Sequence, residues 1–465
     1  MRALAATLML LLATGCPLRA PPQREDLVRD AAPNLKVPDA FAEAGAPAGA
    51  VTDGWLRSFN DPQLDALVQE TLKSNPDLRV AAARVEQAAG YVKSAGGTLY
   101  PQVNAMARGG GTLSGDSSGL EGAGIFVNWE LDLWGRVRAG RATASSQYAS
   151  AELDAEYARQ SMVALTAKSW FLATEARLQK AIAEDMVDSA GRNLNLAEER
   201  LRVGRGDQND VTLARASHAT YRDTVRNLEY AYRQASRALE SLAGRYPAGK
   251  LEVPAQLAAL PGPVPVGLPA ELLERRPDVV AAERRVAMAL YGTQEAQAAR
   301  LPRISLTAAV SSISSDLFFL KERDNPVWSA GAAINLPLFT GGALQGQVDI
   351  RTAEQKVAVA EYGRIGARAF SEVESALSAA FALEDREAIL REAVRENTQA
   401  LEYANVRYRV GAGDMRAVQA QALAVSASRT ALLRVQTERL VQRVNLHLAL
   451  GGGFESKPQG QQQKQ

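Results

Sequence analysis

The chain is poor in the side chains that carry most enzyme chemistry. It has one cysteine, Cys16, and two histidines, His218 and His447, among its 465 residues. A single cysteine cannot form an internal disulfide or a CxxC metal or redox motif. Each histidine lies alone in a helical pattern, which argues against a histidine-based metal site or acid–base pair. The sequence has no phosphate-binding loop and no nucleophile elbow, so it does not suggest an enzyme.

The sequence also lacks an excess of charge and a long apolar run. Lys and Arg together number 53 and Asp and Glu 52, so the formal net charge is +1. This charge gives no long-range field that would attract nucleic acid or another polyanion. Beyond the N-terminus, no stretch approaches the roughly 18 consecutive apolar residues that a membrane helix needs. If the mature chain crosses a bilayer, it must therefore do so as strands.

The N-terminus has the pattern of a secretory signal. MRALAATLMLLLATGC has a basic second residue, an apolar core over residues 3–13 and small residues before Cys16. ATGC resembles a lipobox, so we expect lipidation of Cys16 after removal of residues 1–15. An ordinary signal peptide with a coincidental cysteine is the alternative. Pro17 follows, in place of the Asp that signals retention in the inner membrane of such lipoproteins, which favours the outer membrane.

The sequence contains an internal repeat. NPDLRVAAARV recurs as RPDVVAAERRV, and Pro101 matches Pro302 at an offset of 302 − 101 = 201. VGRGD matches VGAGD further on, where Gly204 and Gly411 give 411 − 204 = 207. The two halves therefore carry the same pattern. The predicted domains are a lipoprotein signal peptide (1–15), an N-terminal linker (16–54), a first repeat (55–248), a Pro-rich linker (249–269), a second repeat (270–452) and a disordered tail (453–465).

Each half is predicted to contain two strands, because apolar residues alternate with other residues there. The four runs are Val103–Ala107, Ile125–Trp134, Ile304–Val310 and Trp328–Leu336. A small soluble sandwich predicts the same alternation. Polar connections and aromatic residues at the strand ends favour membrane strands. Four strands cannot close a barrel, which needs about eight, and open edges are not allowed in lipid. Three chains with four strands each would close a barrel of twelve.

Four long helical stretches are predicted at about 137–203, 207–242, 344–410 and 414–450. Sixty helical residues span roughly 90 Å, far more than a globular helix. Leu433, Leu440, Val444 and Leu448 form a narrow apolar seam. A narrow seam on a long helix indicates a coiled-coil-like wall and not a compact core.

Several segments together resemble one family. They are GWLRSFNDPQLDALVQETLKSNPDLRVAAARVEQA, WELDLWGRVRAGRATA, GLPAELLERRPDVVAAERRV, LPRISLTAA, NLPLFTGG and FSEVESAL. They resemble the signature segments of TolC-like outer-membrane efflux lipoproteins, the outer component of resistance-nodulation-division pumps. The resemblance covers about residues 55–451.

The resemblance implies a fold class and a function. The fold is mainly α with a membrane β-barrel portion: an internally repeated chain, four membrane strands per protomer, a long periplasmic α-barrel and a trimeric channel. The expected partners of this homotrimer are a periplasmic adaptor (membrane fusion) protein, an inner-membrane pump and outer-membrane lipid, without nucleic acid or a cofactor. The expected function is conduction of drugs or other small molecules across the outer membrane, without catalysis.

VGRGD and VGAGD each lie between two long helical stretches, where glycine supplies the left-handed conformation of a tight turn. The resemblance implies that these turns form the periplasmic tips that contact the adaptor. The candidate contact residues are Val203, Gly204, Val410 and Gly411.

Three acidic residues follow the turns, namely Asp207, Asp210 and Asp414. The resemblance implies that they narrow the pore, although the family aspartate commonly lies two residues after the glycine, where Gly413 stands here. Aspartates at the start of a helix also cap free N–H groups and favour the helix dipole. Pore constriction and plain capping are both open.

Three other functions compete with an efflux channel. A duct for type I protein secretion would have the same architecture. A periplasmic adaptor lipoprotein should show one helical hairpin between β-rich halves, whereas this sequence predicts two hairpins and two strand pairs. A purely structural periplasmic coiled coil does not explain the four alternating runs.

Overall fold

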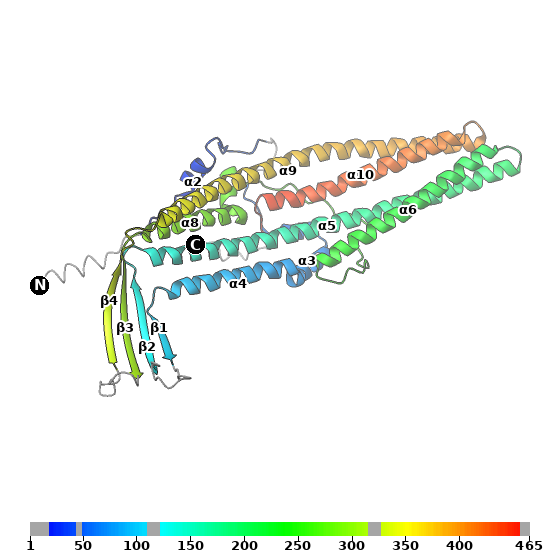
Figure 1. The fold of residues 1–465 in the computed structure, drawn as a ribbon. Helices are drawn as coiled ribbons and strands as arrows, with labels where there is room; N and C mark the ends of the chain where they lie inside the picture. The colour runs from blue at the N-terminus through cyan, green and yellow to red at the C-terminus, as the bar shows by residue number, and fades with distance from the viewer. Residues whose placement is uncertain (1–17, 43–48, 109–120, 315–326, 456–465) are drawn as a thin grey trace. The chain divides into compact units, whose positions relative to one another are not determined.

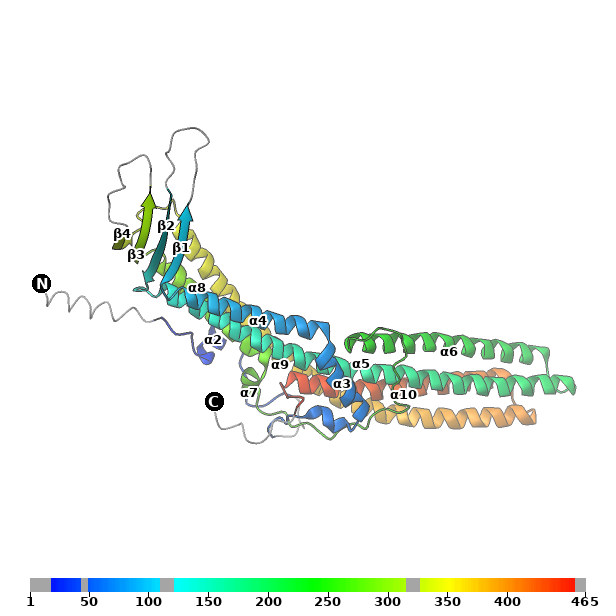
Figure 2. The same cartoon turned by 90° about the horizontal axis from the view of Figure 1, so that it is seen from below.

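The computed structural model describes residues 18–42, 49–108, 121–314 and 327–455 (Figures 1 and 2). The helices are α2 (Arg24–Ala31), α3 (Pro62–Ser74), α4 (Pro76–Gly97), α5 (Arg136–Arg202), α6 (Gln208–Leu242), α7 (Pro269–Arg275), α8 (Pro277–Ala298), α9 (Ala343–Val410) and α10 (Met415–Ala449), with a short 3-10 helix, η1 (Trp55–Phe59). The strands are β1 (Gln102–Arg108), β2 (Glu121–Leu131), β3 (Arg303–Ser314) and β4 (Val327–Asn335). Within the described ranges, no helix has an apolar stretch long enough to cross a membrane.

The internal repeat appears in the order and spacing of the elements. Helices α4 and α8 begin 277 − 76 = 201 residues apart. The starts of α5 and α9 differ by 343 − 136 = 207, and those of α6 and α10 by 415 − 208 = 207. The two halves therefore build the same succession of helix, strand pair and helical hairpin at the offsets found in the sequence.

Local sequence explains where many of these helices begin and end. The Asp61 carboxylate caps α3 by accepting hydrogen bonds from the backbone N–H groups of Gln63 (3.0 Å) and Leu64 (3.1 Å). Helices α3, α4, α7 and α8 each have proline as their first residue, where its fixed φ fits and no N–H is missed. Gly244 and Gly451 follow α6 and α10 with φ of 72° and 67°, a conformation that favours glycine.

The four strands form one antiparallel sheet in the order β1-β2-β3-β4 (Figure 1). Gln102 lies opposite Asn128, and Arg303 opposite Asn335, at the ends of the two hairpins. The two hairpins are joined by β2 and β3, which pair from Glu121↔Ser314 to Leu131↔Ile304. In a single chain, β1 and β4 are the outer strands of the described sheet.

The chain forms two compact units, and each takes segments from both repeats. The first unit comprises residues 1–36, 81–155 and 278–367, and the second comprises 37–80, 156–277 and 368–465. The first unit contains the sheet, and the second contains α6 and α10. The repeats are thus interleaved in space and are not two separate folding units.

The second unit has an aromatic core. Phe59 from η1 packs against Phe171 from α5 with ring centroids 5.1 Å apart, and against Trp55 at 6.3 Å. Burying an aromatic side chain of this kind contributes roughly 1.5–3 kcal/mol. The Trp170 indole donates a hydrogen bond of 2.8 Å to the capping carboxylate of Asp61. Cap and core therefore fix α3 and α5 together.

The predicted strands and long helices are confirmed, with corrections at two strand ends: β4 ends at Asn335, one residue before the predicted Leu336, and β2 ends earlier than predicted. The run Ile125–Trp134 was expected to be a strand throughout, but β2 ends at Leu131. The next residue, Asp132, accepts hydrogen bonds from the backbone N–H groups of Val137 and Arg138, both at 2.9 Å. The chain leaves the sheet there because Asp132 satisfies the first free N–H groups of α5.

Two predicted boundaries also shift. The expected linker 16–54 contains α2, whose Leu27 is buried. At the other end, Phe454 is buried in the aromatic core and the Gly453 N–H donates to Asp53 at 2.7 Å. The ordered chain therefore continues past the expected start of the tail at 453. Residues 456–465 lie outside the described part of the chain.

Candidate docking tips and pore residues

The first tip turn, residues 203–207, joins α5 to α6. Gly204 has φ of 69°, a left-handed conformation that L side chains rarely adopt. The Arg205 N–H donates to the Arg200 carbonyl at 2.8 Å, and the Gly204 N–H to Leu201 at 3.0 Å. This pattern closes the helix and satisfies its last carbonyls. Val203 is 53% exposed, so an apolar side chain stands free at the turn.

The second tip turn, residues 410–414, joins α9 to α10 in the same way. Gly411 has φ of 82°, and the Ala412 N–H donates to the Arg407 carbonyl at 2.8 Å. Val410 is 72% exposed. The predicted turn conformation is therefore present in both hairpins, and each turn presents a valine that a partner could cover.

Two of the three predicted aspartates cap helices. The Asp207 carboxylate accepts from the Asn209 N–H at 3.1 Å, at the start of α6. The Asp414 carboxylate accepts from the Ala417 N–H at 2.8 Å, at the start of α10. The capping alternative is confirmed for both. Each capping hydrogen bond uses one carboxylate oxygen, so capping is compatible with a second role in the pore.

The third aspartate, Asp210, connects the two hairpins. The Tyr408 hydroxyl on α9 donates a hydrogen bond of 3.1 Å to Asp210 on α6. Burial and the negative charge of Asp210 raise the pKa of Tyr408 to about 12, so the phenol keeps the proton that it donates. The hairpins are therefore linked just behind their turns.

Arg200 strengthens the same link. Its guanidinium lies 4.6 Å from the centroid of the Tyr408 ring and donates to the Tyr408 carbonyl. A second nitrogen donates to the Arg205 carbonyl at 3.1 Å, within the first tip turn. Sequence analysis did not single out Arg200 or Tyr408. The available signal was an aromatic residue two positions before the second Val-Gly pair.

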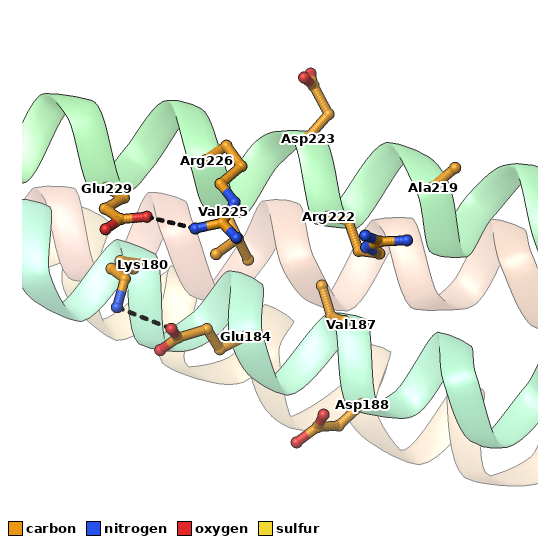
Figure 3. Close-up of a pocket in the computed structure, with 10 residues that line it drawn as sticks. All are labelled: Lys180, Glu184, Val187, Asp188, Ala219, Arg222, Asp223, Val225, Arg226 and Glu229. Carbon is orange, nitrogen blue, oxygen red and sulfur yellow. Dashed lines mark hydrogen bonds and ion pairs between the residues drawn. The ribbon is translucent and has the colours of Figure 1, made fainter.

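A polar groove lies between α5 and α6 (Figure 3). Its volume is about 610 Å³. Two local ion pairs lie in its lining: Lys180 with Glu184 at 2.8 Å, and Arg226 with Glu229 at 2.9 Å. Such exposed pairs are typical of a solvated helical surface and contribute little to stability. The groove shows no arrangement of an activated nucleophile and a base.

The remaining candidate groups are the acidic side chains, the histidines and Cys16. In the described ranges, no cluster of three or more His, Cys, Asp or Glu side chains could hold a metal ion. His447 is buried and stacks on Trp55 with centroids 5.5 Å apart. Burial and the neighbouring Arg443 charge lower the pKa of His447 to about 4, so it is neutral at pH 7. The predicted lipidation site, Cys16, lies outside the described residues.

Comparison with known proteins gives a family match over both repeats. The family model described as outer membrane efflux protein matches residues 67–245 and 268–452. The first segment lies within the first predicted repeat (55–248), and the second begins two residues before the second predicted repeat (270–452) and ends with it. The match therefore covers most of the chain and both copies of the strand pair and helical hairpin.

Individual relatives match over nearly their full length. The probable efflux pump outer membrane protein TtgC of Pseudomonas putida is 30% identical, with 93% of this chain and 94% of the relative covered. The cation efflux system protein CusC of Escherichia coli is 29% identical, with 96% and 97% covered. The solved structure of the outer-membrane channel OprN has a TM-score of 0.80 at 27% identity, covering 91% of this chain and 99% of OprN.

Proposed function

The chain belongs to the outer membrane efflux protein family, and we propose that three copies form the outer-membrane duct of a tripartite efflux system. The chain itself is the outer-membrane component of such a system. The observation that carries the proposed trimer is the four-stranded sheet, whose outer strands β1 and β4 each have a free edge in one chain. Backbone groups left unpaired in lipid cost several kcal/mol each, so the sheet must continue into other copies. Three copies give twelve strands.

The duct acts by conduction and not by catalysis. Its matched relatives are channel components. The energy for transport then comes from the inner-membrane pump, which a periplasmic adaptor joins to the duct. We propose drugs and other small molecules as cargo. Export of proteins through the same kind of duct is the alternative, and only transport measurements with each cargo class separate the two.

The adaptor contacts the two tip turns. This proposal rests on two exposed valines, Val203 and Val410, held by left-handed glycines at equivalent positions of the two hairpins. Covering an exposed valine with a partner surface removes its apolar area from water, which is favourable. Gly204 and Gly411 fix the direction in which each valine points.

The aspartates near the tips narrow the pore in this proposal. Asp210 is held by Tyr408, while Asp207 and Asp414 keep carboxylate oxygens beyond those used in capping. In a trimer each aspartate occurs three times around one axis. A ring of carboxylates attracts cations and resists anions, as rings of acidic side chains do in other channels.

Lipidation of Cys16 anchors the duct to the periplasmic face of the outer membrane. Labelled palmitate should enter the natural protein and should not enter the Cys16→Ala variant. Equal labelling of both proteins would show that the signal is an ordinary one. The anchor is separate from the channel proposal, since strands in the bilayer hold the duct without it.

Transport in cells tests the proposed function. A strain that lacks this protein should regain drug resistance when the natural protein is supplied together with its adaptor and pump. Gly204→Trp and Gly411→Trp should each lose resistance and the adaptor cross-link while trimer yield stays near normal. Wild-type resistance in both variants would show that the tips do not dock the adaptor. Restored protein secretion without drug efflux would favour the alternative cargo.

A further inference from the structure

The internal repeat predicts which residues pair between neighbouring copies of the chain. A seam here is the line of backbone pairing between two adjacent strands. A single chain contains three seams: β1 with β2, β2 with β3, and β3 with β4. The seam between β2 and β3 joins the second strand of the first repeat to the first strand of the second repeat. If the sheets of several copies close into a barrel, β4 of one copy pairs with β1 of the next copy. This fourth seam also joins the second strand of one repeat to the first strand of another. This inference rests on the proposed trimer.

The equivalence of positions follows from the observed hairpins. Gln102 pairs with Asn128 and Arg303 pairs with Asn335, each as the last pair of its hairpin. The first members differ by 303 − 102 = 201 and the second members by 335 − 128 = 207. These are the offsets of the repeat helices, so β1 corresponds to β3, and β2 to β4, without a shift.

The register of the inner seam, β2 with β3, can therefore be used to predict the register of the outer seam, β4 with β1 of the next copy. Leu131 lies opposite Ile304 in the β2–β3 seam. Adding 207 to 131 gives Leu338, and subtracting 201 from 304 gives Val103. We propose that Leu338 of one copy lies opposite Val103 of the neighbouring copy in an antiparallel β4–β1 seam. The pair Trp129↔Leu306 gives Leu336 opposite Ala105 by the same steps.

The length of the strands supports this transfer. Strand β2 continues for three residues beyond its hairpin with β1, to Leu131, and these residues pair with β3 alone. The three corresponding residues after β4 are 336–338, and in one chain they have no strand partner. Pairing with a neighbouring β1 would extend β4 over them. Pro337 has no N–H to donate, so this residue adds no backbone N–H hydrogen bond to the pairing.

Exposure supports it as well. Leu131 and Ile304, which face each other in the inner seam, are both half-buried. Their counterparts Leu338 and Val103 are 88% and 65% exposed in the single chain. Covering an exposed aliphatic side chain with another apolar surface is favourable. A neighbouring copy would therefore cover two side chains that are more exposed than their equivalents inside the chain.

Cysteine pairs test the register. Facing residues in antiparallel strands have Cα atoms about 4.5–5.5 Å apart, within reach of a disulfide, whereas residues two positions out of register are about 7–8 Å apart. The matched pairs are Leu338→Cys with Val103→Cys and Leu336→Cys with Ala105→Cys. Recombining the same four substitutions gives control pairs that are two residues out of register. These slipped pairs are Leu336→Cys with Val103→Cys and Leu338→Cys with Ala105→Cys. Asn335→Cys with Met106→Cys is a matched pair on the opposite face of the sheet.

We expect oxidation in membranes to join copies in the matched pairs and not in the slipped pairs. Cross-linking of a slipped pair in place of the matched ones would overturn the register. So would a trimer, seen under reducing conditions by native mass spectrometry, in which none of the pairs cross-links. If the reduced variants and the natural protein are all monomeric, the proposed trimer itself fails, and the register proposal fails with it.

Discussion

The two helical hairpins share one plan but use equivalent positions differently. In the α5/α6 hairpin, Lys180 and Arg226 line a polar groove with exposed ion pairs (Figure 3). The positions 207 residues later are Glu387 and Leu433, and both are buried. Repetition of a backbone pattern therefore does not repeat its side-chain chemistry. At these positions the first hairpin has a solvent-exposed polar surface, whereas the two helices of the second hairpin are held together by buried side chains.

The buried group of the second hairpin is Glu387. Its carboxylate accepts from Arg391 at 2.6 Å, from Gln436 at 3.0 Å and from Arg439. Burial alone would raise the pKa of Glu387, but hydrogen bonds from Arg439, Arg391 and Gln436 lower it to about 2. The carboxylate is therefore charged at every physiological pH and holds α9 and α10 together.

The largest expected effect comes from removing this charge. Glu387→Gln should lower the free energy of unfolding by about 3–5 kcal/mol, because two arginines lose their buried charged partner. Lys180→Met at the equivalent position of the first hairpin should cost less than about 1 kcal/mol, since its ion pair is exposed. Thermal unfolding of the purified proteins compares them. Equal losses in the two variants would mean that the hairpins do not differ in this way.

A second contrast lies at the ends of α6 and α10, where Glu240 and His447 are equivalent (447 − 240 = 207) and both are buried. Glu240 accepts from the N–H groups of Gly249, Lys250 and Leu251 at 2.6 to 3.0 Å. Burial raises the pKa of Glu240, but these three hydrogen bonds outweigh it and lower the pKa overall. The pKa of His447 is lowered to about 4.

This contrast predicts a pH dependence. The unfolded chain binds a proton at His447 below pH 6.5, while the folded chain does not until about pH 4. The free energy of unfolding is therefore highest, as far as His447 contributes, above pH 6.5. It falls by about 3 kcal/mol as the pH is lowered to about 4. His447→Phe should flatten this part of the curve. Glu240 contributes to the pH dependence only at lower pH, because its stabilising effect is lost below the ordinary carboxyl pKa of 4.5.

Melting temperatures between pH 4 and pH 7 test the assignment. The natural protein should lose stability over this range, and His447→Phe should lose clearly less. An identical pH profile in both proteins would show that another group is responsible.

The two tip turns should also differ. A Cβ atom at Gly206 would lie 2.6 Å from the Leu201 backbone nitrogen, whereas one at the equivalent Gly413 would lie 3.1 Å from the Arg407 side chain. Gly206→Ala should therefore cost about 1–3 kcal/mol, as overpacking does, and Gly413→Ala less. Adaptor cross-linking should weaken more in the first variant. The reverse order would contradict the turn geometry.

The smallest expected change concerns the capping aspartates. Asp207→Ala with Asp414→Ala removes up to six carboxylates from a trimer, two in each of three chains. Loss of a cap costs about 1 kcal/mol per helix. If the carboxylates narrow the pore, conductance in planar bilayers should also rise and block by cations should weaken. A loss of stability with unchanged conductance would leave capping as their only role.

Much of this structure is predictable because its signals are repeated and local. The strand alternation, the long helices and the glycine turns each depend on residues close in sequence. The end of β2 at Leu131 was missed because it depends on Asp132 capping α5, which competes with the alternation. Phe454 was missed because its burial depends on distant core residues. The link between Arg200 and Tyr408 joins residues 208 positions apart, which no local pattern encodes.

The central claim is that this chain works as a trimer with a continuous sheet. Native mass spectrometry of the natural protein, released gently from outer membranes, tests it most directly. The account predicts a single dominant species of three chains that falls apart only when the fold is lost. A stable monomer that remains inserted in the membrane would contradict it, because β1 and β4 would then have open edges in lipid.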